Sequence, residues 1–179
     1  MKRLSVRNSH PYEATGHGHD KAVVVTKVVF IAAPAKVCFG TIAKQLEQPA
    51  GWDRLIRHVW PLSEARGRVG AMSRVLVNLG NMAFHSTAVV SQYRPSRILS
   101  WGTVGYPGIC VRWVLEPEQN GTVVGLTLFW EASENVLNRL VYKITTGRQV
   151  ASDLKKTLAQ LKSVVEDSVS LTKSRQIIS

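Results

Sequence analysis

The chain has 179 residues, of which 45% are hydrophobic, and its formal net charge is +11. This length suits a single domain with a substantial core, and no apolar run is long enough to span a membrane. The basic first residues lack the apolar stretch of a secretory signal, so we expect a cytoplasmic protein.

Residues 1–21 are polar and show no periodicity, which predicts a disordered tail. Residues 22–32 are rich in β-branched side chains and predict a first strand. A short helix is expected over 34–46, because Pro34 suits a helix start, and Pro49 predicts a second short helix that ends near Arg57. His17 and His19 could hold a metal ion only loosely in the tail, so we expect neither a metal site nor a cofactor.

Six further strands are expected, each bounded by glycine, asparagine or proline. Their predicted ranges are 58–66, 71–78, 82–93, 98–104, 109–116 and 122–132. Because the connections are short, we expect an antiparallel meander.

The last third of the chain predicts one long amphipathic helix over 135–167. Its apolar residues recur at steps of three and four from Val136 to Val165. Gly147 interrupts this stripe, which indicates either a kink or close packing, or room for a ligand. Residues 170–179 are expected to be a second disordered tail, so one domain is predicted over residues 22–169.

Several short motifs, in this order, resemble the START and polyketide cyclase/dehydrase (SRPBCC) superfamily. They are residues 33–37 at the first helix, Trp52, residues 93–101 across a hairpin, Glu116-Pro117, and residues 120–122. The resemblance covers residues 22–167. It implies an α+β helix-grip fold, with a seven-stranded curved antiparallel sheet, two short helices and a long C-terminal helix packed across the sheet. It also implies an apolar cavity between sheet and helix that binds hydrophobic small molecules or lipids.

Strand alternation and the helical stripe indicate which residues would line such a cavity. The predicted ligand-binding residues are Trp52, Phe84, Trp101, Tyr106, Trp113, Leu128, Trp130, Leu137, Leu140, Ile144 and Gly147. The facing of Phe84 is open, because the opposite phase of its strand, with His85 inside, is nearly as good. The alternative for each tryptophan is that it simply fills the core.

We therefore expect a protein that binds, and could transport, a hydrophobic small molecule or lipid, and no catalytic residue is assigned. The first alternative is a polyketide cyclase/dehydratase-like enzyme, which needs polar groups inside the cavity. His85 as a base and Arg112 as an enolate stabiliser would serve only if they faced inward, and we expect Arg112 to face outward, opposite Glu131. The second alternative is a basic adaptor whose core is solid.

Two further features bear on compartment and partners. Cys38 and Cys110 are expected to be buried free thiols in a reducing compartment. The positive charge is spread along the chain, with +7 in residues 22–169 and +4 in the two tails. It could be plain solvated surface or could support peripheral contact with an anionic membrane, whereas the lack of any binding motif argues against nucleic acid. The sequence does not indicate an oligomeric state.

Overall fold

The computed structural model describes residues 22–48, 50–64, 67–105, 108–131 and 136–177. Within these ranges, the side chains of residues 22, 131–145 and 172–177 lie outside the description. The predicted tail over residues 1–21, and Tyr106 in its loop, therefore fall outside the described residues.

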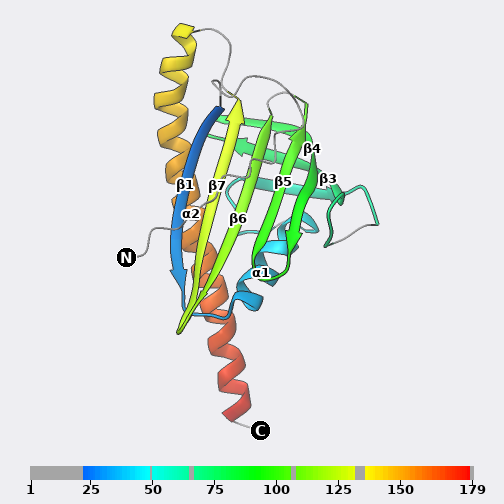
Figure 1. Cartoon of the computed structure of the whole chain (residues 1–179), viewed down its shortest axis with the longest axis vertical. Coiled ribbons are helices and arrows are strands. Elements are labelled where there is room, and N and C mark those ends of the chain that lie inside the picture. The colour runs from blue at the N-terminus through cyan, green and yellow to red at the C-terminus, as the bar shows by residue number, and fades with distance from the viewer. Residues whose placement is uncertain (1–21, 49, 65–66, 106–107, 132–135, 178–179) are drawn as a thin grey trace.

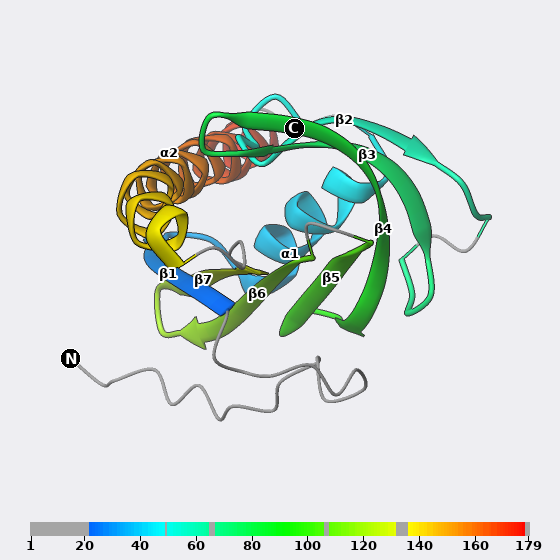
Figure 2. The same ribbon diagram turned by 90° about the horizontal axis from the view of Figure 1, so that it is seen from above.

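One antiparallel sheet holds the seven strands in the order β1-β7-β6-β5-β4-β3-β2. The strands are β1 (Ala22–Ile31), β2 (Ile56–Pro61), β3 (Met72–Leu79), β4 (Met82–Arg94), β5 (Ile98–Val104), β6 (Ile109–Glu118) and β7 (Gly121–Glu131). The sheet curves around the long helix α2 (Val136–Ile177), and the short helix α1 (Ala35–Ala43) lies inside the curve (Figures 1 and 2). The predicted curved sheet with its long C-terminal helix is confirmed.

Helix α2 buries one stripe against the concave face of the sheet. The buried side chains are Val150, Leu154, Leu158, Leu161 and Val165, each at most 2% exposed. Their spacing of three and four residues is the predicted amphipathic pattern. Shortening one of the leucines to alanine would cost about 2–5 kcal/mol, so this stripe is a main anchor of the helix.

The helix extends further than the sequence predicted. It continues to Ile177, whereas we expected it to end near residue 167 and to be followed by a tail from 170. Residues 168–177 contain neither glycine nor proline, so nothing in them ends a helix. The hydroxyls of Ser168 and Ser170 also donate to the carbonyl oxygens of Val165 and Glu166.

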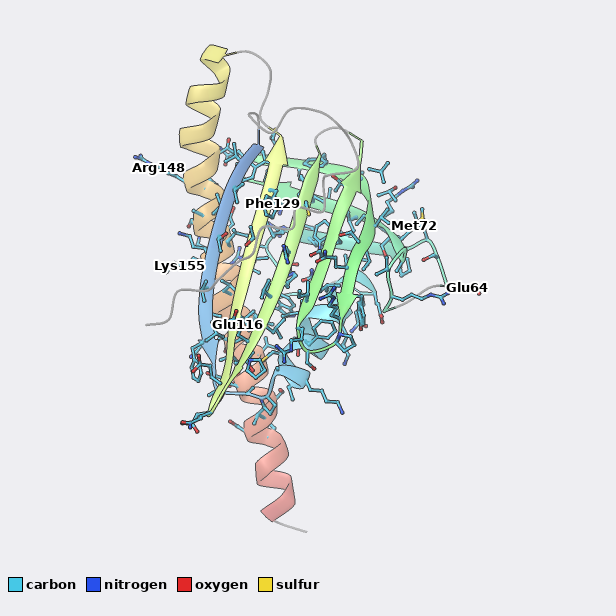
Figure 3. The ribbon with its side chains drawn as sticks, viewed as in Figure 1. Glu64, Met72, Glu116, Phe129, Arg148 and Lys155 are labelled. Atoms are coloured by element: carbon cyan, nitrogen blue, oxygen red, sulfur yellow. The ribbon has the colours of Figure 1, made fainter. Side chains whose placement is uncertain are left out.

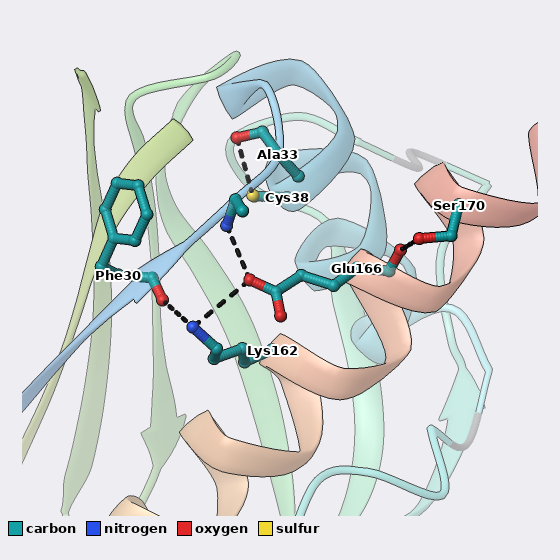
Figure 4. Close-up of polar contacts among 7 residues, drawn as sticks. Phe30, Ala33, Cys38, Lys162, Glu166 and Ser170 are labelled. Atoms are coloured by element: carbon teal, nitrogen blue, oxygen red, sulfur yellow. Dashed lines mark hydrogen bonds and ion pairs between the residues drawn. The ribbon is translucent and has the colours of Figure 1, made fainter. Parts of the chain in front are cut away.

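Polar contacts fix the C-terminal half of α2 to the end of β1 (Figure 4). The Lys162 ammonium donates to the carbonyl oxygen of Phe30 at 2.9 Å and lies 3.3 Å from the Glu166 carboxylate. The same carboxylate accepts the backbone N–H of Ala32 at 2.7 Å. The charged groups of this network are the side chains of Lys162 and Glu166 on α2, and their partners at the end of β1 are neutral backbone groups. Together these contacts set the position of the helix along the strand.

The second predicted short helix, from Pro49 to Arg57, is wrong. One turn of 3-10 helix, η2 (Lys44–Leu46), extends α1 instead, and the described part of the 49–57 stretch forms turns before β2 begins. The cause is Asp53, whose Oδ1 accepts the backbone N–H of Leu55 at 2.8 Å. Such a side-chain bond competes with the helical hydrogen bonds and favours a turn.

Candidate functional site

Three tryptophans dominate the concave face of the sheet. Trp101 on β5, Trp113 on β6 and Trp130 on β7 are each at most 1% exposed. In the pairing of β5 with β6, Trp113 lies opposite Leu99. In the pairing of β6 with β7, Trp130 lies opposite Ile109. Leu128 is buried on the same face. The inward facing that strand alternation predicted for these side chains is confirmed.

A glutamine joins two of these rings. With its amide oriented to suit its neighbours, the Gln45 Oε1 accepts the indole N–H of Trp101 at 3.2 Å and that of Trp113 at 3.3 Å. Because an indole N–H can only donate, the oxygen must face the two rings, and the Gln45 amide nitrogen then faces the other way. That nitrogen donates to Oδ2 of Asp53 at 3.1 Å.

Asp53 completes the polar cluster that bonds to Trp101 and Trp113 through Gln45. Its side chain is buried, and burial raises its pKa from 3.8 to about 7, while the backbone N–H groups of Leu55 and Ile56 act in the opposite direction. Trp52, the residue before it, packs edge-to-face on Trp113 with ring centroids 6.1 Å apart. The cluster therefore holds Trp101 and Trp113 in one fixed orientation.

Trp130 differs from the other two tryptophans. Among the described residues its indole N–H has no hydrogen-bond partner, although the side chain is buried. Leaving a buried donor unpaired costs about 1–3 kcal/mol. Trp130 is the second-last residue of β7, at the end of the sheet where α2 begins (Figure 1). The unpaired donor thus lies on the concave side, at the end of the sheet where α2 begins.

The structure shows which face of the sheet each side chain of β4 occupies, a question that the sequence left open. Phe84 is half-buried on the same face as Ala88, whereas His85 is exposed on the outer face beside Trp60. Phe84 therefore belongs to the concave wall and His85 does not.

Arg112 also faces away from α2, as predicted, but its expected partner was wrong. Across β6 and β7 it lies opposite Thr127, whereas Glu131 pairs in register with Ala22 on β1. The two side chains that we considered as catalytic candidates, His85 and Arg112, are therefore both on the outer face.

The remaining predicted site residues are on or near α2. The side chains of Leu137, Leu140 and Ile144 lie outside the described part of the structure. Gly147 is half-buried, and apart from its chain neighbours and the backbone of its own helix, no described atom lies within 4 Å of the position that a Cβ would occupy. Among the described residues, the glycine therefore does not serve close packing.

A small recess lies elsewhere on the concave side, between η2 and strands β3 and β4. Its volume is about 20 Å³, and Leu46, Ala88, Val90 and Tyr93 contribute to its lining. This volume suits about one water molecule. The recess is at the α1 end of the molecule and is therefore distinct from the predicted cavity.

Gln45 and Asp53 are inward-facing polar residues that the sequence analysis missed. A signal was present for Gln45, which stands seven residues after Cys38 and three after Ile42, both on the buried stripe of α1. Asp53 gives no comparable signal, because Pro49 and the apolar residues around Asp53 predict a helix there.

Two observations concern other chemistry. Cys38 and Cys110 are both buried and free, and burial raises the pKa of the Cys110 thiol to about 11. Within the described residues, no cluster of three or more His, Cys, Asp or Glu side chains could hold a metal ion. Among the same residues, no helix is both long and apolar enough to cross a bilayer.

Comparisons with known proteins agree with this architecture. The model of a family described as polyketide cyclase / dehydrase and lipid transport matches residues 22–166. A comparison with curated protein sequences gave no match.

Among solved structures, TTHA0849 from Thermus thermophilus superposes with a TM-score of 0.66 and 18% identity, covering 82% of this chain and 99% of that one. The Zhui aromatase/cyclase from Streptomyces sp. R1128 gives 0.61 and 18%, covering 79% and 94%. A START superfamily protein from Mycobacterium smegmatis gives 0.58 and 17%, covering 83% and 98%. At these identities the structural likeness concerns the fold alone. Through the family match, the chain belongs to the polyketide cyclase / dehydrase and lipid transport family of the START-related SRPBCC superfamily, as its motifs indicated.

Proposed function

We propose that this protein binds a flat hydrophobic small molecule between the concave face of the sheet and the first half of α2. Trp130, Leu128 and Phe84 would contact the ligand from the sheet. Leu137, Leu140 and Ile144 would cover it from the helix, next to the open position at Gly147, with Tyr106 at the opening. The family description, which includes lipid transport, supports this class of ligand.

The observation that carries the proposal is the buried, unpaired N–H of Trp130. A native fold seldom leaves such a donor unpaired, and a ligand oxygen would satisfy it. The ligand would therefore be apolar with one hydrogen-bond acceptor near its end.

The fixed orientation of Trp101 and Trp113 also favours binding. Their indole N–H groups are bonded to Gln45, so both rings are ordered before any ligand arrives. Preordering of this kind lowers the entropy that binding must overcome. In this account Trp101, Trp113 and Trp52 support the site, and Trp130 contacts the ligand.

A polyketide cyclase/dehydratase-like enzyme is the second candidate, and Asp53 is the observation that favours it. A buried carboxyl group with a pKa of about 7 can exchange protons near neutral pH. However, its Oδ1 is held by Leu55 and its Oδ2 by Gln45, which is the pattern of a structural group. We therefore propose binding, and transport of the ligand, ahead of catalysis, and a cytoplasmic location in keeping with the free thiols.

A matched pair of probes tests the role of Trp130. We expect 2-acetylnaphthalene, which has a carbonyl acceptor, to bind about three- to tenfold more tightly than 2-ethylnaphthalene, which has none, because one neutral hydrogen bond is worth about 0.5–1.5 kcal/mol. Trp130→Phe keeps an aromatic ring but removes the N–H, so the preference should disappear. Isothermal titration calorimetry measures both affinities.

Trp60→Phe is the matched control, because Trp60 is exposed on the outer face of the sheet. This variant should keep the preference for the acetyl probe. If neither probe binds the wild type, or if Trp130→Phe keeps the preference, the proposed site is wrong.

A further inference from the structure

The outer face of strands β2 to β4 carries a group of exposed side chains that the ligand site does not use. We call it the outer patch and define it by Trp60, Leu62, Met72, Arg74, His58 and His85. Trp60 is 44% exposed, Leu62 53% and Met72 39%. The solvated face of an antiparallel sheet normally carries polar residues, so three large apolar side chains there call for an explanation.

Register places these residues side by side. Trp60 pairs with Arg74, and His58 and His85 both lie opposite Leu76, one on each side of it. The backbone N–H of Leu62 donates to the carbonyl oxygen of Met72 at 2.9 Å. This bond places the side chains of Leu62 and Met72 next to each other. The ring of Trp60 stacks on His58 with centroids 5.6 Å apart and contacts His85 at 5.8 Å.

The segment that contains this face is also basic. Residues 54–104 contain seven arginines and a single acidic residue, Glu64, so they carry a net charge of +6 out of the total of +11. Arg57, Arg68 and Arg74 are exposed, and none of them has an ion-pair partner within the described part of the chain. Apolar and aromatic side chains thus stand among uncompensated positive charges.

We propose that the outer patch docks this protein on an anionic membrane surface. Trp60, Leu62 and Met72 would enter the interface between headgroups and acyl chains, where tryptophan is favoured. Arg74 and its neighbours would meet the lipid headgroups, and each basic residue near an anionic surface contributes about 1 kcal/mol. The inference goes beyond the proposed ligand site, because the outer patch is on the opposite face of the sheet.

Other occupants fit the patch less well. A second copy related by twofold symmetry would bring Arg74 toward like charge, since the patch offers no acidic side chain to receive it. Nucleic acid would leave Leu62 and Met72 without suitable contacts. Apolar side chains among arginines therefore favour the membrane.

Vesicle flotation at about 0.1 M salt tests the proposal. We expect binding to vesicles of phosphatidylcholine with 30% phosphatidylserine, and at least tenfold weaker binding to phosphatidylcholine alone. Trp60→Ser should weaken binding to the anionic vesicles about tenfold, because it removes an aromatic anchor from the interface. Arg74→Gln should weaken it about fivefold, in line with the loss of one basic contact.

Two controls match these changes in chemistry but lie elsewhere. Val28→Ser replaces an exposed apolar residue on β1, and Arg148→Gln removes an exposed charge on α2, far from Met72 and Glu64 (Figure 3). Both should bind vesicles like the wild type. All four positions are exposed, so circular dichroism should show unchanged folding.

Three results would overturn the proposal. The first is equal binding to both kinds of vesicle, or none to either. The second is a loss in Arg148→Gln as large as in Arg74→Gln, which would indicate diffuse charge attraction rather than a docking patch. The third is a dimer, or a complex with duplex DNA, that forms more tightly than the vesicle complex and is lost in Trp60→Ser.

Discussion

Replacing Gln45 by leucine is expected to lower the free energy of unfolding by about 3–5 kcal/mol. Leucine fills a similar volume but accepts no hydrogen bond. The indole N–H groups of Trp101 and Trp113 would both remain buried and unpaired, and Asp53 would lose the amide that bonds its Oδ2. Urea unfolding followed by tryptophan fluorescence measures this change.

Gln48→Leu is the control for that experiment. Gln48 is exposed three residues further on, so the same substitution there should change stability by less than about 0.5 kcal/mol. A Gln45→Leu variant as stable as the control would show that the amide does not join the two rings.

Stability should depend on pH through Asp53. Burial raises the pKa of this carboxyl group from 3.8 to about 7, so the folded protein holds the proton more tightly than the unfolded chain does. The contribution of the group to the free energy of unfolding is therefore complete below its unfolded pKa of 3.8 and is lost as the pH rises to about 7. The size of the loss is of the order of 4 kcal/mol.

Asp53→Asn isolates this contribution, because asparagine does not titrate. The variant should be less stable at pH 4, where its amide nitrogen faces that of Gln45. The difference from the wild type should shrink steadily between pH 4 and pH 7, as measured by urea unfolding at each pH. Parallel stability curves for the two proteins would mean that Asp53 titrates alike in the folded and unfolded states.

The fold was largely predictable because its patterns are local. Only one phase of β5, β6 and β7 buries Trp101, Trp113 and Trp130 together, and only one stripe of α2 is apolar. Strand β4 could not be settled in this way, because both of its faces carry apolar residues. Its pairing with β3 decides the matter by placing His85 opposite Leu76 on the outer face.

There is a physical reason why the polar residues of the site could not be predicted from the sequence. Gln45 acts through Trp101 and Trp113, which are distant in the chain, so its role depends on contacts that periodicity does not report. Asp53 makes its decisive bond to the backbone of Leu55, only two residues away, and that bond replaced an expected helix by a turn. Sequence periodicity therefore did not report two kinds of interaction, which are local side-chain bonds to the backbone and contacts with rings distant in the chain.

The membrane surface and the ligand site suggest a division of labour between the faces of the sheet. The concave face would hold the ligand, and the outer patch would hold the protein against the bilayer. Vesicle binding and ligand binding rest on different residues, so one can fail without the other.

Native mass spectrometry of protein purified without detergent tests the central claim most directly. We expect a complex heavier than the chain by one small molecule, which organic extraction releases and which Trp130→Phe retains less well. A spectrum that shows the bare chain alone, at the lowest activation energy and from several expression hosts, would contradict the account. The protein would then be a basic interaction module with a solid core.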